Sequence, residues 1–170
     1  MTDGADAIVR RAHVSVSDKT GLAAFARGLA GLGIEIVSTG GSAAALREAG
    51  VAVRTVEEVT GFPEMLDGRV RTLHPKIHAA ILADRANADH VRAIARLGIE
   101  PIDLVVVNFY PFARVFSESL TSGEATELID VGGPALVRAA AKNAASAAPV
   151  TSPARYAPIL EELASSGRRL

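Results

Sequence analysis

The chain has 170 residues, of which 49% are hydrophobic and 22% are charged. These values lie near the averages of globular proteins, so they exclude a disordered chain, and the length fits a single domain. Eighteen Lys and Arg residues oppose 19 Asp and Glu residues, and the net charge of −1 gives no electrostatic reason to expect a nucleic acid or a membrane surface as partner.

Cysteine is missing from the sequence. Disulfide scaffolds, thiol nucleophiles and thiolate zinc sites are therefore excluded. The first six residues are acidic and polar, unlike a secretory signal, and no apolar run approaches the length of a membrane span. We therefore expect a cytoplasmic protein.

Short apolar runs alternate along the chain with segments of helical periodicity. The expected strands are 12–16, 34–37, 51–55, 104–107 and 147–151. The expected helices are 22–32, 43–49, 88–97, 134–143 with Pro134 at its first position, and 153–163. Residues 56–76 are expected to be irregular, and residues 77–82 fit either a helix or a strand. Pro149 weakens the last strand because it cannot donate to a ladder.

The run Leu104–Val107 has no polar partner face, which is typical of a strand buried on both sides of a parallel sheet. Alternating strands and helices predict an α/β fold of one domain, with a mainly parallel sheet covered by helices on both faces. Ligands of such folds bind beyond the carboxyl ends of the strands. The segments that follow the strands, 17–21, 38–42 and 108–112, are therefore the candidate binding loops.

Two of these loops suit an anion. In Ser38–Ser42, glycines between hydroxyl side chains precede a helix, so backbone N–H groups and the helix dipole could cradle a phosphate. A tight turn with a hydroxyl helix cap is the alternative interpretation. The loop is neither G-x-G-x-x-G nor a P-loop, which argues against a dinucleotide or a triphosphate. Lys19 in the first loop could neutralise the same phosphate.

Two further segments concentrate polar groups. Residues 68–76 hold three cations and a histidine, which could clamp an anionic ligand or could simply face solvent. His74 and His78 flank a proline without a carboxylate, so they do not form a zinc motif. On the last-but-one helix, Arg138 and Lys142 share a face, and Asp130 before it fits either a ligand contact or a helix cap.

Six segments taken together are similar to one family. They are 15–21, 38–42, 60–70, 72–76, 108–112 and 129–143. In order, they resemble the inosine monophosphate (IMP) cyclohydrolase domain, which is the N-terminal half of a bifunctional purine-biosynthesis enzyme. The similarity extends over about residues 10–163.

The resemblance implies a methylglyoxal-synthase-like α/β fold over residues 11–165, preceded by a flexible N-terminus at 1–10. It implies ring closure of 5-formamido-4-imidazolecarboxamide ribotide (FAICAR) to IMP with loss of water, the last step of purine synthesis. It also implies a homodimer, no metal and no organic cofactor, while the charge balance already led us to expect no nucleic acid and no membrane as partner. The transformylase half is absent from the sequence. If the sequence is the complete protein, a separate AICAR transformylase would supply the substrate; if it is a piece of a longer protein, the absence carries no meaning.

The resemblance also implies residue roles. Lys142 would be the proton donor and acceptor, Asp130 would orient the carboxamide, and Tyr110 and Arg71 would lie by the reacting groups. The nucleotide, with its phosphate on Lys19 and the glycine turn, would be held by Ser17, Asp18, Lys19, Thr39, Gly40, Gly41 and Ser42. The base would be lined by Arg69, Val70, Thr72, Val107, Asn108 and Val131.

The sequence departs from the family at Arg71, which replaces a lysine. Arginine can serve as an electrostatic clamp but cannot release a proton near neutral pH. Further departures are Ala79-Ala80, Ala144 and Pro149. Two alternatives therefore stay open: a purine-nucleotide-binding module with little or no catalysis, and a cyclohydrolase that acts on a related nucleotide.

Overall fold

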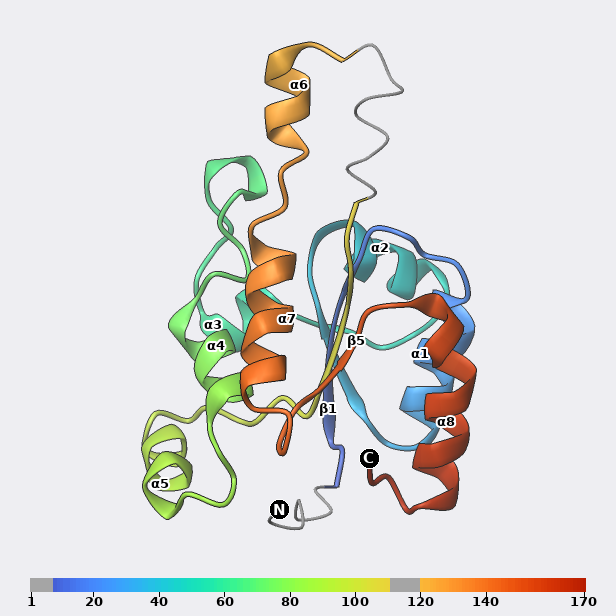
Figure 1. Ribbon diagram of the computed structural model, residues 1–170, viewed down its shortest axis with the longest axis vertical. Coiled ribbons are helices and arrows are strands. Elements are labelled where there is room, and N and C mark those ends of the chain that lie inside the picture. The colour runs from blue at the N-terminus through green and yellow to red at the C-terminus, as the bar shows by residue number, and fades with distance from the viewer. Residues whose placement is uncertain (1–7, 111–119) are drawn as a thin grey trace.

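The fold is built on a five-stranded sheet in the order β3-β2-β1-β4-β5. The computed structural model describes residues 8–110 and 120–170. The strands are β1 (Arg11–Val16), β2 (Glu35–Ser38), β3 (Arg54–Thr55), β4 (Leu104–Asn108) and β5 (Ala148–Val150). Every pairing is parallel, which confirms the predicted α/β fold. The carboxyl ends of the strands therefore share one edge, at the top of Figure 1.

Helices cover both faces of this sheet (Figure 1). One face carries α1 (Leu22–Gly31), α2 (Gly40–Glu48) and α8 (Tyr156–Ser165), which follows the short helix η3 (Pro153–Arg155). The other carries α3 (Val56–Thr60), α4 (Pro75–Leu82) and α7 (Gly132–Lys142). The short helix η1 (Leu66–Gly68) and helices α5 (Ala88–Arg96) and α6 (Ser122–Glu127) lie at the periphery. Among the described residues, no helix combines the length and the apolar character needed to cross a bilayer.

The alternation of side chains along the central strand produces two cores. On β1, Ala12, Val14 and Val16 face the α1 side. Strand β4 is buried along Leu104–Val107, with alternate residues in each core. This is the burial that its continuous apolar sequence predicted.

Helix boundaries differ from the predictions where local capping decides them. Helix α2 begins at Gly40, three residues before the predicted start at 43, so the glycine turn is the first turn of the helix. Residues 77–82 belong to α4, which starts at Pro75 because a proline at the first position costs no helical hydrogen bond. Helix α7 starts at Gly132, which makes Pro134 its third residue rather than its first.

The segment expected to be irregular contains a helix that its capping box explains. Thr55 and Glu58 each bond the other's backbone N–H at the start of α3. The predicted strand 51–55 shrinks to Arg54–Thr55. Helix α6 was not predicted, because its polar sequence buries no side chain.

The start of the chain is described from Ile8 onwards. Residues 1–10 were expected to be flexible, and residues 1–7 lie outside the described residues. However, Ile8 forms a bridge with Arg169, and the N–H of Arg10 donates to Asp103 at 2.8 Å. The described domain therefore begins before residue 11 and extends past residue 165.

An ion-pair cluster closes the amino edge of the sheet. Arg11 is 6% exposed and contacts the carboxylates of Glu35 and Glu100. Arg54 approaches the same two carboxylates at 3.4 and 3.3 Å. Arg11 is the buried member of this cluster, and the carboxylates that compensate its charge are partly exposed, so the cluster joins the starts of β1 and β2 at the surface of the domain.

His13 lies at the centre of β1 and is completely buried. Its neighbours in the sheet are Val37 and Val105, and neither of its ring nitrogens has a hydrogen-bond partner among the described residues. Burial, and to a smaller extent the proximity of His78, lowers the pKa of His13 to about 4. The folded protein therefore holds this imidazole neutral.

This burial predicts acid sensitivity. The unfolded chain protonates His13 near pH 6.5 and the folded chain only near pH 4, so stability from this residue is complete above pH 6.5 and decreases towards pH 4. In denaturant titrations, His13→Leu should gain about 3 kcal/mol over the wild type between pH 7 and pH 4. The exposed His90→Leu variant is the control. An equal pH dependence of wild type and His13→Leu would contradict the prediction.

Candidate functional site

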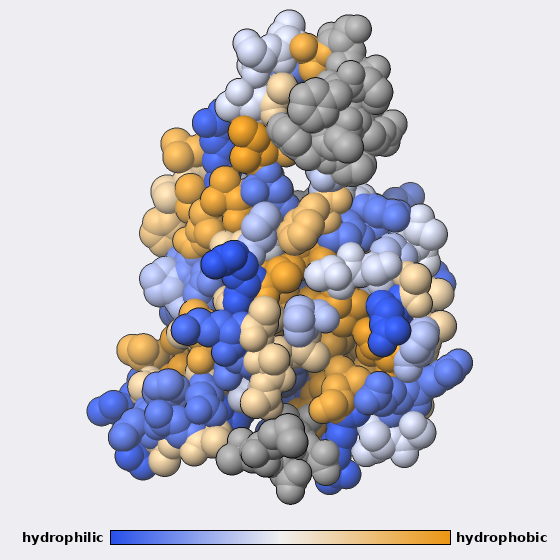
Figure 2. Space-filling model, viewed as in Figure 1, coloured by the Kyte–Doolittle hydropathy of each residue, from blue (hydrophilic) through white to orange (hydrophobic). Residues whose placement is uncertain are grey.

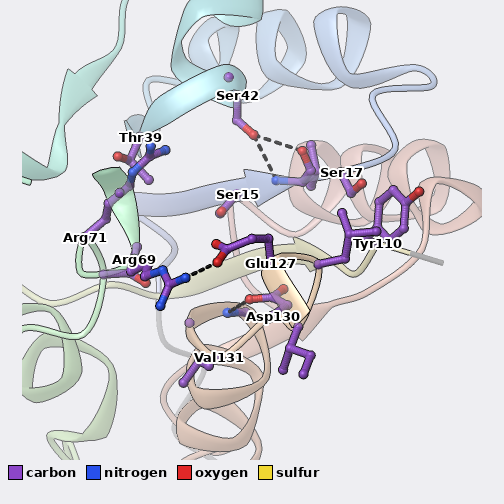
Figure 3. A pocket seen from close by; sticks show the side chains of 18 of the residues that line it. Ser15, Ser17, Thr39, Ser42, Arg69, Arg71, Tyr110, Glu127, Asp130 and Val131 are labelled. Atoms are coloured by element: carbon purple, nitrogen blue, oxygen red, sulfur yellow. Dashed lines mark hydrogen bonds and ion pairs between the residues drawn. The ribbon is translucent and has the colours of Figure 1, made fainter. Parts of the chain in front are cut away.

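A cavity of about 720 Å³ opens at the carboxyl edge of the sheet, between this edge, residues 67–73 and residues 126–133 (Figure 3). It brings together most of the residues that the sequence singled out. These are Ser17, Lys19, Thr39, Gly41, Ser42, Arg69, Arg71, Thr72, Asn108, Tyr110, Asp130 and Val131. Tyr110 follows the end of β4, and the next predicted loop residues, 111 and 112, lie outside the described residues.

The N-terminus of α2 and Lys19 meet in this cavity. The N–H groups of Gly40, Gly41 and Ser42 have no hydrogen-bond partner among the described residues. A Cβ atom added to Gly41 would lie 4.0 Å from Nζ of Lys19. Free N–H groups, the positive end of a helix and an ammonium group are therefore side by side, which is the arrangement that binds an anion.

The two hydroxyl side chains of this turn have different environments. Oγ of Ser42 accepts from the N–H of Val16 at 2.9 Å and donates to its carbonyl at 3.1 Å, so it attaches α2 to β1 (Figure 3). Oγ1 of Thr39 is buried without a partner among the described residues. Ser42 therefore offers a ligand its N–H group, while its hydroxyl holds the turn in place.

Arg71 lies on the other side of this helix start. Its Nε is 2.7 Å from Oε2 of Glu64, but the N–H bond does not point at the oxygen, so the contact is an ion pair rather than an aligned hydrogen bond. A Cβ atom on Gly40 would be 2.2 Å from Nη1, and one on Gly68 would be 1.9 Å from Nη2. The guanidinium thus fits between two glycines, and with Lys19 it flanks the start of α2.

An ion pair between Arg69 and Glu127 spans the cavity from one wall to the other (Figure 3). Arg69 comes from the segment after η1 and Glu127 is the last residue of α6. Both side chains are well exposed, so the pair adds little stability. Its effect is to place one cation and one anion across the space that a ligand would occupy.

Asp130 caps helix α7 and also lines the cavity. Its Oδ1 accepts from the N–H of Gly133 at 2.9 Å, in the first turn of α7, although the N-cap residue itself is Val131. A Cβ atom on Gly133 would lie 2.3 Å from Oδ2, so glycine is needed here for the carboxylate to keep its place. The carboxylate is exposed and retains lone pairs for a ligand.

Five predicted site residues do not line this cavity. Lys142 is the last residue of α7, which begins at the cavity with Gly132, so about 15 Å of helix separate them. Val107 is 1% exposed in the α4–α7 core. Val70 lines a smaller neighbouring pocket, Gly40 faces a shallow one on its other side, and Asp18 is held to Asn108 through its backbone. In this chain the geometry does not support contact of Lys142 or Val107 with a ligand.

Sequence reasoning missed several residues that line the cavity. They are Ser15, Val16, Asp67, Gly68, Leu73, 126–129, Gly132 and Gly133. Ser15 could have been found, because it precedes Ser17 by two residues and so shares its face of β1. Residues 126–128 carry no apolar period that would have placed them against the sheet.

The two histidines of the 68–78 region have structural surroundings. Nδ1 of His74 accepts from the N–H of Lys76 at 3.1 Å and caps α4. Nε2 of His78 is buried and finds no partner in the described part of the chain, and burial lowers the pKa of this residue. Within residues 8–110 and 120–170, no group of three or more His, Asp or Glu side chains could hold a metal ion.

Substitutions at Asp130 should separate its capping role from its charge. Asp130→Ala removes the acceptor of the Gly133 N–H and should lower the free energy of unfolding by about 1 kcal/mol. Asp130→Asn keeps an acceptor oxygen and should stay within about 0.5 kcal/mol of the wild type. Urea denaturation measures both. Equal loss in the two variants would show that the charge, rather than the cap, stabilises α7.

Comparisons with known proteins identify relatives of this chain. The family model described as MGS-like domain matches residues 21–135. "Bifunctional purine biosynthesis protein PurH" of Lacticaseibacillus casei (strain BL23) is 58% identical over 156 residues, which is 91% of this chain and 31% of that protein. The protein of the same name from Magnetococcus marinus is 57% identical and is covered to 29%. The chain thus spans about a third of these relatives.

A solved structure shares the fold over nearly the whole chain. The structure titled "Crystal structure of ForH" superposes with a TM-score of 0.79 at 36% identity, over 94% of this chain and 81% of that one. The matched segment of the family model includes the glycine turn of α2, the segment 67–73 and Asp130, which all line the cavity. With a family model across most of its length and a parallel sheet of the expected order, the chain belongs to the MGS-like domain family.

Proposed function

We propose that this chain is an IMP cyclohydrolase, which closes FAICAR to IMP with loss of water in the cytoplasm, as the last step of de novo purine synthesis. The observation that carries the proposal is the meeting of an anion site and a free carboxylate in one cavity. Relatives named as purine biosynthesis proteins, 51–58% identical over most of the chain, support it.

The substrate's phosphate would bind at the N-terminus of α2. There it would receive the N–H groups of Gly41 and Ser42 and the ammonium group of Lys19. Charge-assisted hydrogen bonds of this kind are about twice as strong as neutral ones. The base would then extend towards Asp130 and Tyr110, beside Arg69, Thr72 and Val131.

The chemistry joins two groups of one molecule. The carboxamide nitrogen attacks the formyl carbon and loses a proton, while the formyl oxygen gains one and becomes a hydroxyl. That hydroxyl then leaves as water together with the proton of the former formamido nitrogen, and a C=N bond forms between this nitrogen and the former formyl carbon. Because the step is intramolecular, the enzyme chiefly has to fix the reactive rotamer and stabilise the developing oxyanion. No metal or organic cofactor takes part in the reaction as proposed.

The residues that line the cavity can divide these tasks. The free oxygen of Asp130 would accept from the carboxamide N–H and orient it for attack. The hydroxyl of Tyr110 would donate to the oxyanion and assist proton transfer, and Arg71 would supply positive charge. Lys142, to which the resemblance assigns proton transfer, could take that role only if a second copy of the chain brought it to the cavity.

A binding module without turnover is the competing function. Arg71 favours it, since a guanidinium paired with Glu64 cannot act as an acid. Tyr110 and Asp130 lie in the cavity and favour catalysis. A cyclohydrolase that acts on a related nucleotide shares all of these features and differs only in which base it accepts.

Two lysine variants test the proposal. Ultraviolet absorbance should record formation of IMP when the chain is added to FAICAR. Lys19→Ala should raise KM by about tenfold or more through the lost phosphate contact. Lys142→Ala, which removes a lysine from the far end of α7, should stay within about threefold of the wild-type rate.

The outcomes separate the candidate functions. No IMP from the wild type, together with tight IMP binding, would support the binding module. A loss of rate of about 100-fold in Lys142→Ala would contradict the assignment of chemistry to the residues of one chain.

We further propose that the protein acts as a homodimer and that an AICAR transformylase supplies its substrate. Large apolar side chains are exposed around the segment 62–73, at the upper left of Figure 2. Among them are Phe62, Met65, Leu66 and Leu73. A gathering of apolar side chains on a surface is typical of a protein contact.

Sedimentation equilibrium should therefore give twice the mass of one chain. Leu66 is 67% exposed, so Leu66→Glu should leave the fold intact while it weakens the dimer by about tenfold or more. Val91→Glu on α5, another exposed apolar side chain on a different surface, is the matched control. A wild-type monomer at micromolar concentration would overturn the proposal.

A further inference from the structure

The side chain of Asn108 is used almost entirely inside the protein. Its Oδ1 accepts from the backbone N–H groups of Ser17 at 2.7 Å and Asp18 at 2.8 Å. Its Nδ2 donates to the carbonyl of Asp18 at 2.8 Å. A side-chain amide has two acceptor lone pairs and two donor hydrogens. Both lone pairs and one hydrogen are therefore committed to the backbone of one loop.

These bonds extend the sheet by means of a side chain. Val16, the last residue of β1, lies opposite Asn108, the last residue of β4. Beyond this point the backbones no longer pair, and the Asn108 amide replaces the missing ladder bonds for the next two residues of the β1 chain. The course of the chain from Ser17 onwards is therefore set by β4.

The loop held in this way is the one that carries Lys19. On its other side, Oδ1 of Asp18 accepts from the N–H of Thr20 at 2.9 Å, and bonds from Thr20 lower the pKa of Asp18. The carbonyl of Lys19 accepts from the N–H of Leu22 at the start of α1. Lys19 thus lies between two fixed points, and its ammonium group lies close to Gly41 on α2.

We infer that Asn108 is a positioning residue, which holds Lys19 against the N-terminus of α2 and so sets the affinity for the ligand's phosphate group. The inference rests on the proposed function, because it takes the anion at α2 to be a nucleotide phosphate. It differs from the role that the resemblance implied for Asn108, contact with the base. An ammonium on a fixed backbone loses less conformational entropy on binding than one on a mobile loop.

The two roles predict different losses of affinity for IMP and for inosine, which lacks the phosphate. Isothermal titration calorimetry measures both ligands on the wild type, Asn108→Ala, Lys19→Ala and the double variant. Asn108→Ala should weaken IMP by about tenfold and change inosine by less than about twofold. The double variant should bind IMP within about threefold of Lys19→Ala, because the two residues act through one contact.

Asn143→Ala is the matched control. Its Nδ2 also donates to backbone carbonyls, those of Ile81 and Ala83, but at the far end of α7. This variant should lower Tm while it leaves the affinities for IMP and inosine unchanged. It therefore separates a loss of general stability from a loss of position.

Other results would overturn the inference. Equal weakening of IMP and inosine in Asn108→Ala would place Asn108 on the base. If the loss of IMP affinity in the double variant equals the product of the two single losses, Asn108 and Lys19 act independently.

If Asn108→Ala does not fold, Asp18→Ala removes the second fixed point of the loop and should show the same selective loss of affinity for IMP. If the wild type binds IMP no more tightly than inosine, both the inference and the phosphate site of the proposed function are overturned. If it binds IMP more tightly than inosine but does not convert FAICAR, only the proposed reaction is contradicted.

Discussion

The parallel pairing of β1 with both β2 and β4 is the constraint on which the rest of the molecule depends. Because all three strands run in one direction, the chain leaves each of them at the same edge. The loop of Lys19, the first turn of α2 and the end of β4 therefore meet, although about 90 residues separate the first from the last. Crossing helices supply both cores, and the edge itself stays open for a ligand.

Sequence patterns predicted the parts of the fold that depend on local periodicity. The apolar run of β4 and the alternation in β1 gave the parallel sheet, and its direction gave the edge where the anion loops meet. Features that depend on contacts distant in sequence could not be predicted in this way. The pairing of Arg11 with Glu35 and Glu100, and the span from Arg69 to Glu127, join residues that only the folded chain makes neighbours.

In the site, too, residue types predicted the kind of ligand, but not which residues the fold brings to the cavity. Residue types at Lys19 and the glycine turn indicated an anion, the resemblance added an amide contact at Asp130, and the cavity contains all three. The resemblance also assigned a role to Lys142, but the length of α7 separates it from the cavity. The sequence already implied this distance, because Lys142 lies ten residues after Gly132 and a helix rises about 1.5 Å per residue.

Arg71 shows how a substitution fits its surroundings. A guanidinium is flat and wide, and here it lies between Gly40 and Gly68, where a Cβ atom on either glycine would collide with it. Glu64 pairs with its Nε. An arginine at this position therefore reinforces the positive potential at the start of α2 without adding a group that exchanges protons.

The Arg11 cluster and the cavity occupy opposite ends of β1, and this separation has an evolutionary consequence. Substitutions in the Arg11 cluster change the stability of the sheet at its amino edge, but they do not change any residue that lines the cavity. Substitutions at the carboxyl edge change recognition while the far anchor keeps the sheet assembled. Ligand preference can therefore change through substitutions at the carboxyl edge while the ion pairs at the amino edge keep the fold stable.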